Sequence, residues 1–117
     1  MRINERVVGG VTILSVIGRV TSRENAVLLK DTINGTVRRG HLHVALDLQR
    51  VPYIDSCGLG VIVGGHTIVS LQGGRLLLLN VAECLHDLLR VMKLETVLEI
   101  FDSEQEAVRS VSPETAA

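Results

Sequence analysis

A short polar run, Asp55-Ser56-Cys57, stands directly before a long apolar segment that is rich in glycine. If that segment is a helix, the run lies at its N-terminus, where backbone N–H groups are free and the helix dipole is positive. A hydroxyl such as that of Ser56 then either caps the helix or carries a phosphate that faces those N–H groups. Asp55 complements the same dipole. The residue types at this position therefore allow capping, phosphorylation or, through Cys57, nucleophilic chemistry.

Cys57 is the side chain of this run that could act as a nucleophile, because thiols at helix N-termini are often reactive. A cysteine phosphatase also needs an arginine a few residues onward to hold the phosphate, and Val63 stands there instead. No histidine lies close by in the sequence. We therefore favour the interpretation of Cys57 as a small buried thiol.

The four histidines do not form a recognisable metal or catalytic set. His41 and His43 are expected on one face of a strand, but no cluster of Cys, Asp or Glu completes a ligand set near them. His66 and His86 fall on predicted helices without a partner and are expected to face solvent or to be capped. The chain also has no Walker A, Gly-x-Gly-x-x-Gly, Cys-x-x-Cys or His-Glu-x-x-His motif. We predict that the chain is not an enzyme and needs no metal or cofactor.

Length and composition favour one packed domain without affinity for nucleic acid. The chain has 117 residues, of which 46% are hydrophobic and 21% are charged, as in a folded globule. Its formal net charge of -1 provides no basic field for a phosphate backbone. Tyr53 and Phe101 are its only aromatic residues, so it lacks the stacking platforms of single-strand binders.

The N-terminus and the cysteine count indicate a cytoplasmic protein. Glu5 stands where a secretory signal needs an apolar run, and no apolar stretch reaches the roughly 18 residues of a membrane helix. Cys57 and Cys84 are too few for a disulfide framework, so both are expected to be reduced. We expect no membrane insertion, and either a monomer or a weak homodimer.

Turn signals and hydrophobic periodicity predict alternating strands and helices. Gly9-Gly10 separates two Val- and Ile-rich runs and predicts a β-hairpin. Thr21 and Glu24 form a capping box that begins the first helix. The expected elements are strands over 3–8 and 11–17, a helix over 22–39, a strand over 42–48, a helix from Asp55-Ser56 to Gln72, a strand over 76–79, a helix over 82–92, a strand over 97–100 and a helix over 103–111. Residues 1–112 are assigned to the domain and 113–117 to a disordered tail.

The second helix of this series contains four glycines, each of which costs a helix roughly 1 kcal/mol relative to alanine. We expect them to be kept because the helix backbone approaches a neighbouring element closely. The four are Gly58, Gly60, Gly64 and Gly65.

The order of elements predicts an α/β fold, with about four helices packed on a mixed sheet of about four to five strands. The strands over 11–17 and 42–48 are joined by a helix and should run parallel. Their carboxyl ends then meet at one edge of the sheet, which brings residues 18–21 close to Asp55 and Ser56. This edge is the expected position of a functional site.

The segment from Leu46 to Ile62 resembles the signature of the STAS domain family of bacterial anti-sigma factor antagonists. The resemblance is carried by the Asp-Ser-x-Gly-Leu-Gly core, by Gly73-Gly74 before the next strand and by the region around Leu88, Met92 and Leu94, and it extends over nearly the whole chain. The core residues are Asp55, Ser56, Cys57, Gly58, Leu59 and Gly60.

The resemblance implies a switch that is not an enzyme. In such proteins the unmodified domain binds an anti-sigma factor that is also a serine kinase with a histidine-kinase-like ATPase fold, and sigma factor is released. Phosphorylation reverses this binding, and a serine phosphatase of the PP2C type resets it. Ser56 matches the phosphorylated serine, and the core residues match the partner-binding surface. ATP and magnesium belong to the kinase, so the resemblance assigns no cofactor to this chain.

Arg19 and Thr21 depart from the family pattern, because many members carry Gly-Glu-Leu-Asp where this chain has Gly18-Arg19-Val20-Thr21. Both acids are thus replaced at positions that the resemblance places in the partner-binding surface. The replacement is consistent with a different kinase, or with a branch that no longer controls sigma factor directly. Arg19 could instead pair with a phosphate on Ser56 or point into solvent.

Two other functions compete with the phosphorylation-controlled switch. The nearer one is a STAS scaffold module in a larger signalling or transport-associated assembly. An enzyme with Cys57 as nucleophile comes third. A neighbouring gene for a histidine-kinase-like ATPase would favour the switch, and its absence would favour the scaffold.

Overall fold

The computed structural model describes residues 1–111, which form one five-stranded mixed sheet with four helices. The strands lie side by side in the order in which they occur in the sequence, from β1 to β5. The elements are β1 (Arg2–Val8), β2 (Val11–Ile17), α1 (Arg23–Arg38), β3 (His43–Arg50), α2 (Ser56–Leu71), β4 (Arg75–Leu79), α3 (Glu83–Val91), β5 (Glu99–Phe101) and α4 (Glu104–Val111). The predicted α/β fold is confirmed. The tail predicted over 113–117 lies outside the described residues.

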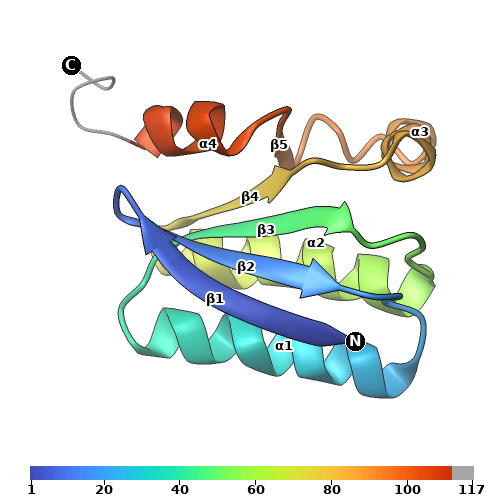
Figure 1. The fold of residues 1–117 in the computed structure, drawn as a ribbon, viewed down its shortest axis with the longest axis horizontal. Helices are drawn as coiled ribbons and strands as arrows, with labels where there is room; N and C mark the ends of the chain where they lie inside the picture. Colours follow the sequence, from blue (N-terminus) through green and yellow to red (C-terminus); the bar gives the residue numbers. More distant parts are fainter. Residues whose placement is uncertain (112–117) are drawn as a thin grey trace.

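The helices divide unequally over the sheet. Helices α1 and α2 cover one face, α4 covers part of the other face, and α3 stands beyond the end of the sheet where β3 and β4 finish (Figure 1). Strand β1 pairs antiparallel with β2, and every later pair is parallel. The predicted hairpin and helical crossover are therefore both confirmed, and the crossover brings the carboxyl ends of β2 and β3 to the same edge.

Local chemistry explains the hairpin between β1 and β2. Gly9 and Gly10 both adopt positive φ, at 56° and 81°. A two-residue turn of this kind matches the right-handed twist of the strands and needs residues that tolerate positive φ. The two strands then pair without a break, from Val8 opposite Val11 next to the turn to Arg2 opposite Ile17 at the far end.

Each face of the sheet has its own apolar core. The larger core lies under α1 and α2 and includes Leu14, Leu29, Leu46 and Ile62, each at most 1% exposed. The smaller core lies under α4, where Ala107 is fully buried among residues of β2, β3 and β4.

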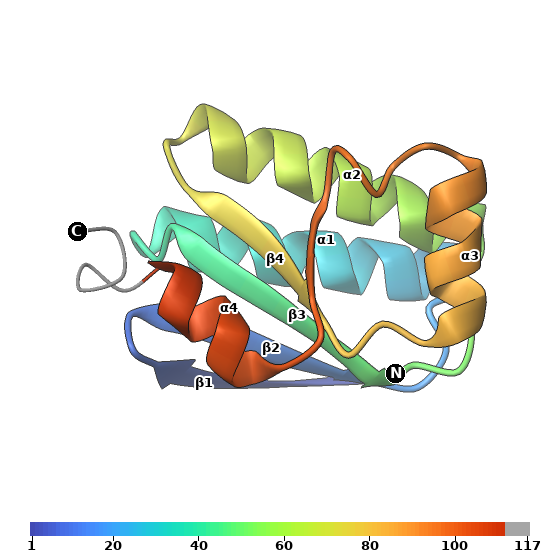
Figure 2. The same cartoon turned by 90° about the horizontal axis from the view of Figure 1, so that it is seen from above.

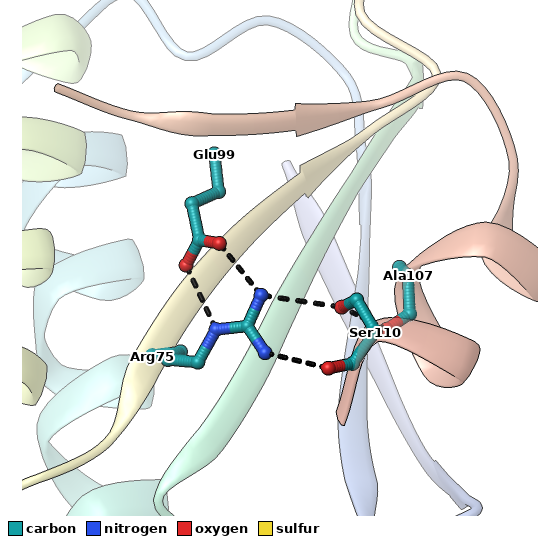
Figure 3. Close-up of polar contacts among 4 residues, drawn as sticks. All are labelled: Arg75, Glu99, Ala107 and Ser110. Carbon is teal, nitrogen blue, oxygen red and sulfur yellow. Dashed lines mark hydrogen bonds and ion pairs between the residues drawn. The ribbon is translucent and has the colours of Figure 1, made fainter. Parts of the chain in front are cut away.

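Polar contacts supplement the smaller core by holding the end of α4. The guanidinium of Arg75 donates to both carboxylate oxygens of Glu99, at 2.9 and 2.6 Å, and to the Ser110 carbonyl at 3.0 Å (Figure 3). The Ser110 hydroxyl donates in turn to the Ala107 carbonyl at 2.7 Å. The hydrogen bonds that Arg75 donates to the Glu99 carboxylate raise the pKa of Arg75 above its ordinary value. This clamp therefore fixes the C-terminal helix to β4 and β5.

Two predicted boundaries are wrong. Helix α1 is capped by Ser22, whose side chain accepts from the Asn25 backbone N–H at 3.1 Å, and not by Thr21. Val20 forms a bridge with Ile54, which keeps the chain extended up to the helix and leaves Thr21 outside it.

The last strand also differs, because β5 comprises Glu99–Phe101 and not 97–100. The backbone N–H groups of Val97 and Leu98 both donate to the Leu94 carbonyl. Those two residues thus belong to a turn, and apolar character alone misplaced them in the strand.

The glycines of α2 fall into two pairs. A side chain at Gly58 would meet the Val20 carbonyl oxygen at 2.7 Å, and one at Gly65 would meet Ile33 Cδ1 at 3.2 Å. At Gly60 and Gly64 no atom of residues 1–111 outside the adjacent helix backbone lies within 4 Å of the added carbon. Close approach therefore explains the first pair, and the prediction that it explains all four is wrong.

Among residues 1–111, no helix combines the length and the apolar character that crossing a membrane requires.

Candidate functional site

The N-terminus of α2 is capped by Asp55 and not by Ser56. The Asp55 backbone is extended, and its side chain accepts from the Gly58 backbone N–H at 3.0 Å. Ser56 is the first helical residue and is exposed. Within the described residues its side chain makes no hydrogen bond, so the hydroxyl is free for another role. The capping alternative considered for Ser56 is thus contradicted, and Asp55 takes that role.

Two loops hold this helix start in place. The loop after β2 pairs with the loop after β3 through backbone hydrogen bonds from Val20 N to Tyr53 O, at 3.0 Å, and from Asp55 N to Val20 O, at 3.1 Å. A third bond joins Gly18 N to Arg50 O at 3.1 Å. The predicted meeting of residues 18–21 with Asp55 and Ser56 at one sheet edge is therefore confirmed.

Gly58 lies where the loops press against α2. A carbon added there would meet the Val20 carbonyl oxygen and Val20 Cγ1, each at 2.7 Å, and Ile54 Cγ2 at 2.8 Å. The next residue, Leu59, is 5% exposed and belongs to the larger core. The position of Ser56 relative to the sheet is thus set by backbone contact on one side and apolar burial on the other.

The loop residues Arg19 and Thr21 differ in their surroundings. Arg19 is exposed, and its backbone carbonyl accepts from Asn25 Nδ2 at 3.0 Å, which ties the loop to the first turn of α1. Thr21 is half-buried. The loop is thereby fixed while the Arg19 side chain stays accessible next to the segment that bears Ser56.

An apolar groove of about 530 Å³ begins beside Ser56 and lies between α2 and α3. Several of its large side chains are unusually exposed, namely Tyr53 at 58%, Met92 at 52% and Leu88 at 38%. The lining residues are Tyr53, Ile54, Asp55, Ser56, Leu59, Gly60, Val63, Leu88, Met92 and Leu94. We call this surface the α2–α3 groove.

Sequence reasoning missed the α2–α3 groove, because the apolar periodicity that predicts a helix over 82–92 does not show which of its apolar side chains stay exposed. In the structure that helix buries Leu85 and Leu89 and exposes Leu88 and Met92. Its apolar stripe was therefore wider than the core needs. Two features of the sequence could have indicated an exposed apolar surface: this wide apolar stripe on the helix, and the single tyrosine, Tyr53, just before the Asp-Ser pair.

Cys57 is exposed, so its interpretation as a buried thiol is wrong. The thiol lies at a shallow hollow between α1 and α2, together with Lys30 and Gly60. It faces away from the sheet because Gly58 and Leu59, the next two residues of the helix, take the buried positions.

The histidines lie apart from this site. His41 precedes β3, and its Nδ1 pairs with Thr12 Oγ1 at 3.0 Å. Within residues 1–111, His66 and His86 each have a buried Nδ1 without a hydrogen-bond partner, which differs from the solvent-facing or capped position expected for them. Among residues 1–111, no three His, Cys, Asp or Glu side chains gather in a way that could hold a metal ion.

Comparison with known proteins identifies the fold and one family. The family model for the STAS domain matches residues 2–107. The chain is 28% identical over 99 residues to a Paenibacillus polymyxa protein named anti-sigma F factor antagonist, with 85% of each chain covered. It also resembles the crystal structure of a candidate anti-sigma factor antagonist from Thermotoga maritima, with a TM-score of 0.86, 30% identity and 93% of each chain covered.

The Bacillus protein SpoIIAA shows the same fold in two states. Its unphosphorylated form matches with a TM-score of 0.74 at 18% identity, covering 94% of this chain and 97% of SpoIIAA. Its phosphorylated form matches with a TM-score of 0.73 at 18% identity, covering 94% of this chain and 99% of SpoIIAA. At this level of identity the likeness concerns the fold alone.

Proposed function

The chain belongs to the STAS domain family, and we propose that it is an anti-sigma factor antagonist controlled by phosphorylation of Ser56. The unmodified domain binds an anti-sigma factor that is also a serine kinase with a histidine-kinase-like ATPase fold, and sigma factor is released. Transfer of phosphate from ATP to the Ser56 hydroxyl ends that binding. A PP2C-type serine phosphatase restores the hydroxyl. The domain acts in the cytoplasm, is not itself an enzyme and leaves ATP and magnesium to the kinase.

The observation that carries this proposal is the free hydroxyl of Ser56 at the first position of α2. Because Asp55 already accepts the Gly58 N–H, the helix cap does not need the serine side chain. The positive end of the helix dipole tolerates a phosphate, which carries about -1.5 to -2 charges. The fold can therefore accept the modification without rearrangement.

The α2–α3 groove supplies a reason why phosphorylation would control binding. Ser56 lies among the residues that line the groove, next to the exposed side chains of Tyr53 and Met92. A partner that places apolar side chains there would remove water from the serine. Desolvating a doubly charged phosphate is costly, so the phosphorylated surface should lose affinity for the same partner.

The names of the relatives support the same role. The Paenibacillus protein is named an anti-sigma F factor antagonist, and SpoIIAA is described in phosphorylated and unphosphorylated forms. We infer the partner-binding residues from the match to the family motif and from their position around the groove. They are Arg19, Thr21, Asp55, Ser56, Cys57, Gly58, Leu59 and Gly60.

A kinase assay tests the acceptor. Candidate anti-sigma factor kinases encoded next to the gene are incubated with the chain, ATP and magnesium, and the product is analysed by mass spectrometry. We expect one added phosphate on Ser56, and none on the Ser56→Ala variant. Ser70, which is exposed in the last turn of α2, provides a matched control, because Ser70→Ala should accept phosphate as the unmodified sequence does. Phosphate found at another residue, or retained by Ser56→Ala, would contradict the proposal.

A second function, a scaffold module of a larger assembly, is favoured by one observation. The loop Gly18-Arg19-Val20-Thr21 lies against the Ser56 segment, and it presents a cation where many family members have acids. A scaffold would bind its partner with equal affinity before and after modification of Ser56, whereas the switch would not.

A further inference from the structure

The sheet face under α4 is divided into an apolar half and a polar half. Figure 2 shows α4 over the part of the sheet next to the turn between β1 and β2, while the opposite ends of β2 and β3 carry no helix. Val108 of α4 lies close to Gly9 in that turn. The strand register places Asn4 opposite Ser15, and Ser15 beside Asp47, so that one polar row crosses three strands in the uncovered half.

The polar row borders a hollow of about 310 Å³. That volume is roughly ten times the ~30 Å³ share of a water molecule in the liquid, which suffices for a small organic molecule. The lining residues are Asn4, Ser15, Val16, Ile17, Asp47, Gln49 and Arg50. We call this feature the polar hollow; it lies apart from the α2–α3 groove, with which it shares no lining residue.

One carboxylate in the polar hollow is held in place but only partly used. Asp47 Oδ1 accepts from the Gln49 backbone N–H and from Asn80 Nδ2, each at 3.1 Å. Within residues 1–111, Asp47 Oδ2 has no hydrogen-bond partner. The side chain is therefore oriented by one oxygen while the other can still accept a hydrogen bond.

The two charged residues of the polar hollow also stay unpaired. In the described part of the chain, neither Asp47 nor Arg50 takes part in an ion pair. The nearby cation Arg6, which projects from β1 on the same sheet face, is instead bound by Glu104, and Arg75 is bound by Glu99. The hollow thus combines an anion and a cation that form no ion pair in the described part of the chain, although the charge of Asp47, after the hydrogen bond and charge of Glu104, contributes to the raised pKa of Arg6.

We propose that the polar hollow binds a free α-amino acid. Its ammonium group donates to Asp47, and its carboxylate accepts from the guanidinium of Arg50. An ammonium group is a donor only and a carboxylate an acceptor only, so a molecule with both groups matches the two unpaired charges. The amides of Asn4 and Gln49 and the hydroxyl of Ser15 supply both donors and acceptors for a polar side chain of the ligand.

This site requires neither phosphorylation nor a protein partner. It nevertheless touches the segment that positions Ser56, because the Arg50 carbonyl accepts from Gly18 N in the loop that continues to Arg19. The inference therefore stands or fails independently of the proposed switch.

Titration of the ¹⁵N-labelled full chain with the twenty standard amino acids at millimolar concentration, followed by NMR, tests the proposal. We expect at least one polar amino acid to shift the amide signals of Asn4, Ser15, Asp47 and Gln49 with saturation. The amide of that amino acid, which lacks the carboxylate, and its N-acetyl derivative, which lacks the ammonium group, should each bind about tenfold more weakly. No saturating shift with any amino acid, or an amide or N-acetyl form that binds as tightly as the free amino acid, would overturn the proposal.

Charge variants then assign the two ends of the ligand. In Arg50→Gln the amino acid and its amide should bind equally, and in Asp47→Asn the amino acid and its N-acetyl form should bind equally. Arg38→Gln, at an exposed cation in the last turn of α1, is the matched control and should bind as the original chain does. Arg50 is exposed and makes no side-chain hydrogen bond within the described residues, so its variant should fold even if Asp47→Asn does not. An Arg50→Gln variant that still prefers the free acid over its amide would contradict the assignment.

Discussion

The start of α2 and the end of α4 are both helix termini fixed by polar contacts, but they differ in what remains unpaired. At the end of α4, Arg75, Glu99 and Ser110 satisfy one another. At the start of α2, Asp55 completes the cap and leaves the hydroxyl of Ser56 exposed beside an apolar groove. A polar group without a partner next to exposed apolar side chains is suited to recognition, whereas a closed set of hydrogen bonds stabilises the fold.

The largest expected effect concerns the backbone contact that positions Ser56. Gly58→Ala inserts a carbon 2.7 Å from the Val20 carbonyl oxygen and should lower the free energy of unfolding by about 2–3 kcal/mol. Gly64→Ala, in the same helix but with open space around it, should raise stability by about 0.5–1 kcal/mol. Urea unfolding of both variants measures the difference. Equal stabilities would mean that the loops do not press against α2 at Gly58.

The second-largest expected effect on stability concerns the clamp that Arg75, Glu99 and Ser110 form at the end of α4. Arg75→Gln removes the bidentate pair with Glu99 and the bond to Ser110, and should cost about 1–2 kcal/mol after allowance for partial exposure. Arg39→Gln, which breaks the more exposed pair with Glu5, should cost about 0.5 kcal/mol or less. Chemical denaturation checks the stabilities, and affinity for the anti-sigma factor should be unchanged in both. Weaker partner binding by Arg75→Gln would show that the α4 end is not purely structural.

The cap on α2 should have a smaller effect. Asp55→Ala loses the hydrogen bond to the Gly58 N–H and should destabilise the chain by about 1 kcal/mol. Asp55→Asn keeps an acceptor oxygen and should lower the free energy of unfolding by only a few tenths of a kcal/mol. Thermal unfolding of the two variants distinguishes them. If Asp55→Ala is as stable as the unmodified chain, Ser56 has taken over the cap and is not free in the way proposed.

The smallest expected effect is a coupling between Arg19 and phosphorylated Ser56. A charge-assisted contact across the paired loops should stabilise the phosphorylated state by about 1 kcal/mol at most. The change in unfolding free energy on phosphorylation is compared between the unmodified sequence and Arg19→Glu, as a double-mutant cycle. If phosphorylation shifts both proteins equally, Arg19 does not sense the phosphate and instead concerns partner choice.

The sequence predicted the backbone arrangement of the site well, because it depends on strong local and topological rules. Gly9-Gly10 specified the hairpin, and the parallel crossover brought Val20 next to Tyr53 and Asp55. The cap of α1 was misplaced because Thr21 and Glu24 fit the capping pattern, while the bridge from Val20 to Ile54 displaces the helix start by one residue. That bridge is a tertiary contact that local spacing does not contain.

Surface features were harder to predict than the backbone. Helical periodicity shows that Leu88 and Met92 lie near the apolar stripe of α3, but it does not show where the sheet ends and the groove begins. Cys57 was misjudged for a similar reason, since its exposure depends on the rotation of α2 that Gly58 and Leu59 fix. The polar hollow left no sequence signal at all, because Asn4, Ser15 and Asp47 meet only through the strand register.

The most direct test of the central claim is calorimetric titration of the anti-sigma factor kinase with the chain in its unmodified and Ser56-phosphorylated forms. The proposal predicts that phosphorylation weakens binding by more than about tenfold while the fold, monitored by circular dichroism, stays intact. Ser56→Asp should also bind more weakly, although Asp carries less charge than phosphate. Equal affinity of the authentic phosphoserine form and the unmodified form would contradict the switch.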